Sequence, residues 1–210
     1  MKKILTILAA ALFCTSAFAQ FTIEAGYNNS RIYSKVLGEK STQMLNGFQV
    51  GIDYSLNLGG SDFNLNPGVY FDVLKGVTAK VGNTKTTLTE TYFQMPLYLT
   101  YDFYVLNDVT GYLFAGPSFS VGIQSREKSM AGKEVTSVVK RYDENPDPLK
   151  NPYEYNRCDL LLGCGLGFKI MDQFRLRFGW DMGIIDRFGI DLDKTSRHRG
   201  QSYIAVGYSF

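Results

Sequence analysis

Residues 158–184 read CDLLLGCGLGFKIMDQFRLRFGWDMGI, and large apolar side chains occupy every second position along most of this stretch. A period of two is typical of β-strands, whose successive side chains point to opposite faces. The tripeptide Met-Asp-Gln at 171–173 interrupts the pattern and predicts a short turn between two antiparallel strands. One row of this predicted hairpin is apolar, whereas the other row mixes charged residues with glycine.

The same alternation recurs in both directions along the chain. Apolar rows occupy 21–27, 48–58, 63–73, 93–103, 113–123, 158–170, 174–184 and 204–210. No position in these rows is charged, so all charge within the predicted strands lies on the intervening row. The charged residues of that intervening row are Glu24, Asp53, Asp72, Asp102, Asp159, Lys169, Arg175, Arg177 and Asp181.

Alternation alone does not decide which row faces inward, because a soluble barrel or sandwich has the same period with the opposite facing. Glycine is frequent on the polar row, where a crowded barrel interior with large charged neighbours can use it. Aromatic residues stand at the ends of the apolar row, as in the interfacial belts of membrane barrels. We therefore expect the apolar row to face lipid and the charged row to face the lumen.

The N-terminus has the pattern of a secretory signal peptide. Two lysines precede an apolar run over residues 4–13, and the small-residue triplet Ala-Phe-Ala at 17–19 predicts cleavage after Ala19. A retained membrane anchor fits less well, because a spanning helix needs roughly 20 apolar residues. Residues 1–19 are thus predicted to be a signal peptide and residues 20–210 a single exported domain.

The connections between the predicted strands alternate in length, as in outer-membrane barrels, where short turns line one rim and long loops the other. An open edge would leave backbone groups unpaired in hydrocarbon, so the strands must close on themselves. The sequence predicts an all-β fold, a closed eight-stranded antiparallel transmembrane up-and-down β-barrel, with both termini at the short-turn, periplasmic rim. Short links fall at 59–61, 107–108 and 171–173, and long ones at 29–46, 74–90, 124–156 and 186–199.

Composition excludes several function classes. The chain has 22 basic and 20 acidic residues, and loss of the two lysines in the signal peptide leaves a formally neutral domain, which argues against nucleic-acid binding. Cys158 and Cys164 lie six residues apart in one predicted strand, roughly 20 Å, too far for a disulfide. His198 is the only histidine and falls in a predicted loop, so we expect no metal site, no cofactor and no catalytic group.

Residues 92–101, YFQMPLYLTY, resemble the "Y-L-x-I-P-L-L-L-K-Y" strand of the Bacteroidetes outer-membrane β-barrel family, also called PorT-like. Residues 115–117 with Gly122, and Asp159 with 163–167, are similar to two later strands of that family. The resemblance implies a barrel in the outer membrane, and little about activity, because few members have a known one. One branch serves secretion and gliding, and nothing in this chain matches it specifically. The C-terminus is similar to the assembly signal of such barrels, which implies that Tyr208 and Phe210 are read by the barrel assembly machinery.

The nine charged residues of the inward row admit three interpretations. An eight-stranded barrel is only wide enough to be filled by side chains, so we expect a salt-bridged plug, including a contact between Glu24 and Arg177, rather than an ion path or a catalytic carboxylate cluster. We also expect the strands before and after Gly82 to continue above the membrane as a hairpin.

These features favour a structural or recognition role through the extracellular loops, not an enzyme. The expected partners are outer-membrane lipid and an unidentified extracellular or envelope component. Three alternatives remain open: a narrow porin-like channel for ions or small solutes, a soluble periplasmic β-barrel carrier, and an enzyme that acts on lipid or lipopolysaccharide through His198.

Overall fold

The computed structural model describes residues 19–36, 38–132, 134–140, 142, 156–187 and 196–210. The predicted signal peptide lies outside these residues except for Ala19. The described residues contain no helix long and apolar enough to span a bilayer. The strands are β1 (Ala19–Val36), β2 (Glu39–Asn57), β3 (Phe63–Val81), β4 (Thr84–Leu106), β5 (Val109–Ala131), β6 (Glu134–Lys140), β7 (Cys158–Ile170), β8 (Phe174–Gly183) and β9 (Ser196–Ser209).

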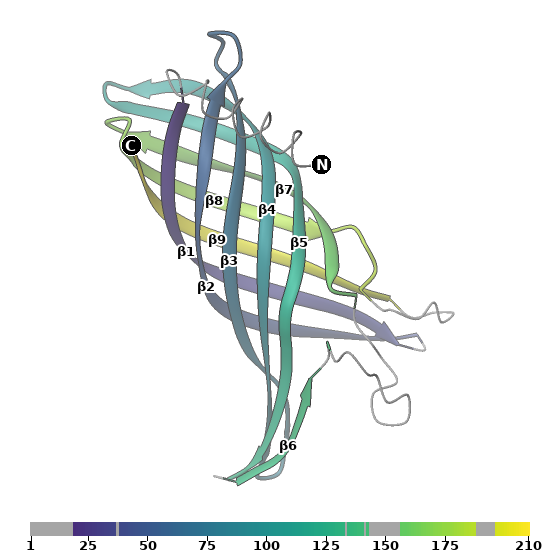
Figure 1. Cartoon of the computed structure of the whole chain (residues 1–210). Coiled ribbons are helices and arrows are strands. Elements are labelled where there is room, and N and C mark those ends of the chain that lie inside the picture. Colours follow the sequence, from purple (N-terminus) through teal and green to yellow (C-terminus); the bar gives the residue numbers. More distant parts are fainter. Residues whose placement is uncertain (1–18, 37, 133, 141, 143–155, 188–195) are drawn as a thin grey trace, which may run out of the picture.

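Eight of these strands form a closed ring. The pairing runs β1–β2–β3–β4–β5–β7–β8–β9, every neighbour is antiparallel, and β9 pairs back with β1. Ile23 faces Tyr208 and Tyr27 faces Ile204 across this seam. Figure 1 shows the front and back walls of the barrel crossing obliquely, as the tilt needed to close a sheet requires. The predicted eight-stranded antiparallel barrel is confirmed.

The two rows of side chains separate as predicted. The apolar row points away from the barrel, so that Leu97 and Leu162 expose 45% and 52% of their surface. The charged row points inward, where Glu24 and Asp72 are 1% and 0% exposed. A soluble barrel would show the reverse, because its apolar side chains would fill the interior. The outer surface is therefore an apolar belt of the kind that meets acyl chains.

The glycines of the inward row make room for aromatic rings. A Cβ atom on Gly167 would lie 2.3 Å from Cζ of Tyr112, and one on Gly179 would lie 2.2 Å from Cζ of Tyr203. Such distances are far below van der Waals contact, so no other residue fits at these positions without moving the ring. The sequence correctly indicated a crowded interior: the large neighbours of these two glycines are tyrosines, whereas a Cβ on Gly163 would lie 2.2 Å from Oδ1 of the charged Asp181.

The short-turn rim is as predicted, whereas the opposite rim differs from the prediction. The turns at 58–62, 107–108 and 171–173 are short and lie on the same rim as the C-terminus. The prediction of long loops at the opposite rim is wrong for most of its residues. Residues 29–46 and 74–90 belong to the β1–β2 and β3–β4 hairpins, and 124–140 is largely the end of β5 plus β6.

The extensions of β1, β2 and β5 and the added strand β6 escaped prediction, because neither face of a strand meets lipid beyond the apolar belt and apolar alternation is not required there. They are held by continuous pairing, as between Thr89 and Arg126, and by the β-branched residues that strands favour. The expected continuation of β3 and β4 around Gly82 is confirmed. Register shifts at Val77/Ala79 and Ser129/Met130 are β-bulges, which bend and twist a sheet.

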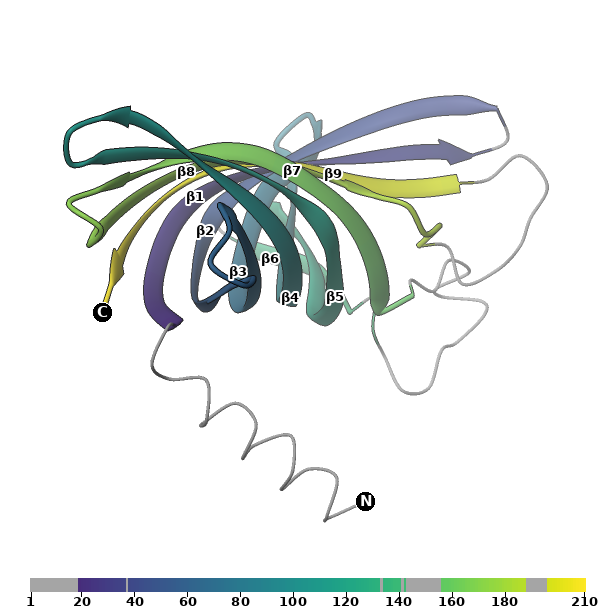
Figure 2. The ribbon, with the colours of Figure 1, turned by 90° about the horizontal axis from the view of Figure 1, so that it is seen from above.

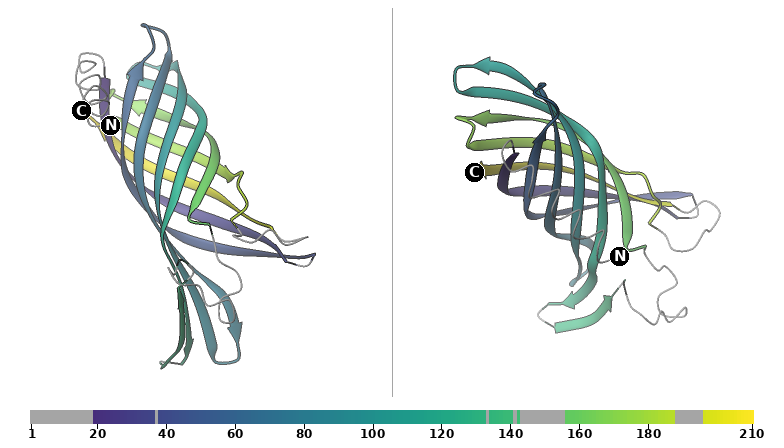
Figure 3. Two further views of the ribbon diagram at one scale, coloured as in Figure 1. Left: turned by 45° about the vertical axis from the view of Figure 1, so that its right-hand side comes forward. Right: turned by 45° about the horizontal axis from the view of Figure 1, so that its top comes forward.

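The extensions leave the barrel as two separate ribbons. Figure 3 shows the outer ends of β3, β4 and β5 projecting together with β6, apart from the β1–β2 hairpin. From above, the β1–β2 hairpin lies beside β9 (Figure 2), and Lys35 pairs with Ser196 there. We call the ribbon formed by residues 75–91 and 124–140 the β3–β6 extension.

Candidate functional site

The lumen near the short-turn rim contains discrete ion pairs. Lys169 Nζ lies 2.5 Å from Asp102 Oδ2, and Asn64 Nδ2 donates to the same oxygen at 3.0 Å. Arg175 Nη1 lies 2.6 Å from Asp53 Oδ1, and both side chains are 3% exposed. Each cation has one carboxylate at contact distance, so charge is compensated pair by pair.

The next layer brings two carboxylates together around one arginine. Arg177 Nη2 lies 2.7 Å from Glu24 Oε2, which confirms the contact expected from the sequence. The Tyr70 hydroxyl lies 2.7 Å from Glu24 Oε2 and 2.9 Å from Asp53 Oδ2. The Arg177 guanidinium also lies over the rings of Tyr70 and Tyr203, at 4.9 and 5.3 Å from their centroids. Charge pairing and cation–π contacts together fill this layer.

The middle of the lumen is closed by amides and tyrosines. Gln94 Nε2 donates to Asp72 Oδ2 at 2.5 Å, and Gln201 Nε2 donates to Asp181 Oδ2 at 3.0 Å. The Tyr98 hydroxyl donates to Asp181 Oδ1 at 3.0 Å. The cavity among these side chains offers about 10 Å³ to the centre of a water molecule, room for about one water. The free space among these side chains is therefore no larger than a single water.

A second charged cluster, the outer cluster, lies at the opposite end of the lumen. Glu90 is fully buried and accepts hydrogen bonds from Tyr92 and from Ser125 Oγ, the latter at 3.2 Å. Its oxygens lie 3.7 Å from Arg187 Nη1 and 3.9 Å from Arg197 Nη2. Two arginines thus share one carboxylate, at longer distances than in the inner pairs.

Arg199 completes the outer cluster. Its Nε lies 3.8 Å from Asp159 Oδ2, and its Nη2 donates to Ser120 Oγ at 3.0 Å. The guanidinium lies 4.0 Å from the centroid of the Tyr92 ring. Arg187 Nη1 donates to the Tyr92 hydroxyl at 2.8 Å, so both arginines contact the same tyrosine.

The outer cluster also contains residues from the connecting segments that follow β6 and β8. Arg187 follows β8, and its Nη2 donates at 2.5 Å to the hydroxyl of Tyr142, which follows β6. Burial raises the pKa of the Tyr142 hydroxyl, so it stays neutral at neutral pH. The backbone N–H of Arg187 donates to the Arg197 carbonyl at 2.9 Å. Arg187 therefore joins the segment after β6, through Tyr142, to β4, through Tyr92, and to β9, through Arg197.

The structure brings all nine predicted residues into the lumen but spreads them over its whole length. The sequence missed Glu90, Arg187, Arg197 and Arg199, because each lies in a segment predicted to be a loop. Period-two spacing of Arg197, Arg199 and Gln201 was the available signal that β9 begins earlier. With these four residues the network contains seven acidic and six basic side chains, far closer to balance than the predicted six and three.

His198 is not a solvated loop residue as predicted. It lies on β9 opposite Tyr33, on the outward side, and is half-buried. Its Nδ1 has no hydrogen-bond partner among the described residues. Cys158 and Cys164 are free and exposed on β7, as expected. The described residues contain no cluster of three or more potential metal ligands.

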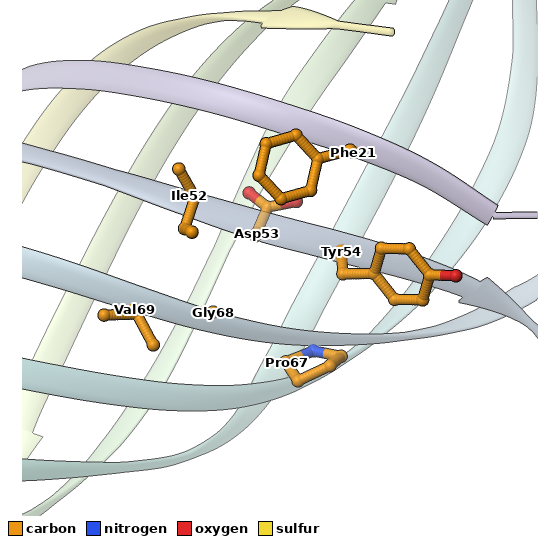
Figure 4. A pocket seen from close by; sticks show the side chains of 7 residues that line it. All are labelled: Phe21, Ile52, Asp53, Tyr54, Pro67, Gly68 and Val69. Atoms are coloured by element: carbon orange, nitrogen blue, oxygen red, sulfur yellow. The ribbon is translucent and has the colours of Figure 1, made fainter. Parts of the chain in front are cut away.

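A larger hollow lies on the apolar outer surface, and of the charged network only Asp53 contributes to its lining. It measures about 450 Å³ and lies beside Pro67, which has no N–H to donate to β2 (Figure 4). Direct pairing between β2 and β3 is interrupted here, between Asp53/Gly68 and Leu56/Leu65. Because the walls are apolar and face the lipid side, this hollow suits acyl chains rather than a polar ligand. Its lining residues are Phe21, Ile52, Asp53, Tyr54, Pro67, Gly68 and Val69.

Comparison with known proteins agrees with this architecture. The family model for the outer membrane protein beta-barrel domain matches residues 15–189. A search of curated proteins finds no match.

The solved structures that resemble the chain have low sequence identity. Ail, the attachment invasion locus protein of Yersinia pestis, is 16% identical, with 92% of this chain and 99% of that chain covered and a TM-score of 0.49. Neisserial surface protein A is 16% identical, with 90% and 97% covered and a TM-score of 0.44. OprG from Pseudomonas aeruginosa is 13% identical, with 92% and 96% covered and a TM-score of 0.44. Because the family model spans most of its length, the chain belongs to the outer membrane protein β-barrel family.

Proposed function

We infer that this protein is a structural or recognition component of the outer membrane, a closed barrel that holds ordered hairpins outside the cell. The observation that carries this proposal is the contrast between a filled lumen and long strand extensions. Asp181, Gln201 and Tyr98 occupy the centre of the barrel, which supports a lumen closed to solutes. The strands nevertheless continue well beyond the apolar belt, which only an external role requires.

Export and orientation follow the same proposal. Cleavage after Ala19 would leave β1 almost complete, and the short turns would lie in the periplasm. The C-terminal aromatics Tyr208 and Phe210 would be read by the barrel assembly machinery, and the Phe210 N–H donates to the Phe21 carbonyl at 2.8 Å, at the closing seam. The resemblance of residues 92–101 supports placement in the Bacteroidetes outer-membrane β-barrel family, also called PorT-like. The remaining partner would be an extracellular or envelope component that contacts the hairpins.

Two native cysteines test embedding and orientation together. Cys158 lies at the outer end of β7, and Cys164 lies six residues further along the same outward face. In intact cells, a membrane-impermeant maleimide should label Cys158 and spare Cys164, which would be covered by acyl chains. Labelling of Cys158 only after the outer membrane is permeabilised would reverse the orientation. Equal labelling of both would support the soluble carrier.

A narrow channel is tested by planar-bilayer recording. The wild-type barrel should give no discrete conductance, because the lumen is packed along its length. The matched variant is D53A/R175A, which removes one inner ion pair and leaves the exposed apolar side chains of the barrel unchanged. Conductance in the variant alone would show that the pair closes the lumen. Discrete conductance in the wild type would favour the porin-like alternative.

We also infer that the protein is not an enzyme. A catalytic histidine is normally oriented by a hydrogen bond to its second ring nitrogen, and Nδ1 of His198 has none among the described residues. Purified protein should not hydrolyse lipid or lipopolysaccharide in detergent. Activity that disappears in H198A but persists in R31Q, a change at another outward-facing residue near the same rim, would contradict this.

A further inference from the structure

The outward side of the β3–β6 extension carries a cluster of cations. Strand register places Lys75 opposite Thr89, and Thr89 opposite Arg126, in one row across three strands. The next row contains Lys128, opposite Thr87. We call this surface the basic face. Its cations are Lys75, Lys80, Lys85, Arg126, Lys128 and, opposite Arg126 on β6, Lys140.

No described acidic residue of the extension shares this face. Glu127 pairs with Leu88, and Glu134 pairs with Ala131, which places both on the opposite side of the sheet. Lys80 and Lys85 are directly opposite each other on the basic face. Like charges in that position repel each other. The positive charge of the basic face is therefore not balanced by the described acidic residues of its own strands, and the face suits an anion.

The first row of the basic face lies at the height of lipid headgroups. The uninterrupted outward apolar row of β3 ends at Val73, and Lys75 follows it by two residues, roughly 7 Å along the strand. Val77 is exposed on the same face beyond Lys75. Arg126 follows Ile123 by three residues, roughly 10 Å. Because the strands are tilted, the height of each cation above the apolar belt is smaller than its distance along the strand. The headgroup layer on each side of a bilayer is about 5–8 Å thick, so both cations fall within it.

A groove on this face provides further donors for an anion. It measures about 240 Å³ and combines cationic groups with threonine hydroxyls and a glutamine amide, the groups that bind phosphate oxygens. The groove opens on the same side of the sheet as the apolar belt. Its lining residues are Lys75, Thr87, Thr89, Gln124, Arg126, Lys128 and Met130.

The opposite rim shows the reverse charge. Asp62, Asp108 and Asp172 are exposed in or beside the short turns. Lys169, the basic residue of the described chain nearest that rim, points into the lumen. Exposed cations of the described residues are thus confined to the outer end. A bilayer whose outer leaflet carries phosphate-bearing headgroups would match this asymmetry.

We propose that the basic face binds phosphate groups of lipid headgroups in the outer leaflet and thereby seats the β3–β6 extension against the membrane surface. The proposal rests on the orientation inferred above. Phosphate oxygens between Lys75 and Arg126 would supply the missing negative charge, while acyl chains of the same lipid continue along the apolar belt below. The extension would then lie at a fixed angle to the membrane.

Boundary-lipid selectivity measured by spin-label spectroscopy tests this proposal. The folded barrel is reconstituted in phosphatidylcholine bilayers that contain a small amount of spin-labelled phosphatidic acid or spin-labelled phosphatidylcholine. The wild type should select phosphatidic acid. K75Q/R126Q should reduce that preference about fivefold or more, since a basic residue near an anionic surface contributes roughly fivefold in affinity, and high salt should reduce it as well.

The matched control is K35Q/K40Q, which removes the same charge from the β1–β2 hairpin. Those lysines lie eight residues beyond Tyr27 and Phe48, roughly 26 Å along the strands and beyond the headgroup layer, so this variant should keep the wild-type preference. Heat-modifiable gel mobility would establish that both variants fold.

Three results would overturn the proposal: no selectivity in the wild type, equal loss in both variants, or binding only to a soluble sulfated polysaccharide. The last result would assign the face to a macromolecular polyanion. Because the spin-labelled lipid is present in both leaflets, the outcome does not depend on orientation, which the cysteine labelling tests separately.

Discussion

Buried charges are compensated differently at the two ends of the lumen. At the short-turn end, three carboxylates each lie close to one cation, at 2.5, 2.6 and 2.7 Å, and Arg177 also lies 4.0 Å from a second carboxylate, that of Asp53. At the outer end, three arginines surround Glu90 and Asp159 at 3.7, 3.9 and 3.8 Å, and Tyr92 lies between them. The inner end is a set of tight pairs, and the outer end is a shared cluster.

This difference follows from what each end must hold. The inner pairs cross the lumen between strands that are not neighbours in the ring, β7 with β4, β8 with β2 and β8 with β1, and the closed ring holds those strands in place. The outer cluster collects Arg187 and Tyr142 from connecting segments onto β4. Several long contacts around one carboxylate tolerate small displacements of those segments. We infer that the inner pairs hold the barrel wall together, whereas the outer cluster anchors the connecting segments that follow β6 and β8.

Loss of one member of an inner pair should have the largest effect. R177M leaves Glu24 buried without its ion pair, and breaking a buried pair costs about 3–5 kcal/mol. Urea unfolding of the barrel in lipid vesicles would measure the loss of unfolding free energy. The double variant E24Q/R177M should recover much of it, since no buried charge is left unpaired. A loss below about 1 kcal/mol in R177M would mean that the pair is solvated.

The outer cluster should tolerate the corresponding change better. R187M removes a guanidinium from Glu90, but Arg197 and the Ser125 hydroxyl remain near that carboxylate. We expect a cost of about 2–3 kcal/mol in the same unfolding measurement. If R187M were as costly as R177M, the contrast between tight pairs and a shared cluster would be wrong.

The inner end could be read from the sequence, and the outer end could not. Within the bilayer one face of each strand meets hydrocarbon and the other the lumen, so residues such as Leu176 and Arg177 alternate and reveal the strand. Beyond the bilayer both faces lie outside hydrocarbon, and this constraint ends. The stretch that contains Thr86, Thr87 and Thr89 then has no apolar row, and β6 and the start of β9 read as loop.

Specific contacts were predictable only where geometry left few choices. Glu24 and Arg177 lie on strands that both start at the short-turn rim, and their contact was expected on that ground. The position of Glu90 beside Arg187 depends on where a connecting segment returns to the barrel, which alternation does not encode. The match between Gly167 and the Tyr112 ring depends on register between strands far apart in sequence.

That glycine match gives the next prediction. In G167A the new methyl group would lie 2.3 Å from the Tyr112 ring, so the ring must move within the inner half of the lumen. Overpacking of this kind costs about 1–2 kcal/mol. G200A is the control, because its nearest neighbour, a Tyr33 ring carbon, is 3.4 Å away, and it should unfold almost as the wild type does. Equal stability of G167A and wild type would mean that the inner layer repacks freely.

The smallest expected effect belongs to a single hydroxyl of the outer cluster. Y142F removes the oxygen that accepts a hydrogen bond from Arg187 Nη2, and the guanidinium keeps its contacts with Tyr92 and Glu90. One partly buried hydrogen bond contributes about 0.5–1.5 kcal/mol, and a shared cluster should place the loss at the lower end. Y104F, which removes an exposed hydroxyl bound to Asn107 at the short-turn rim, should have no measurable effect on unfolding. A loss in Y142F as large as that in R187M would show that this hydroxyl, rather than the shared carboxylate, fixes Arg187, and the outer end would then resemble the inner one.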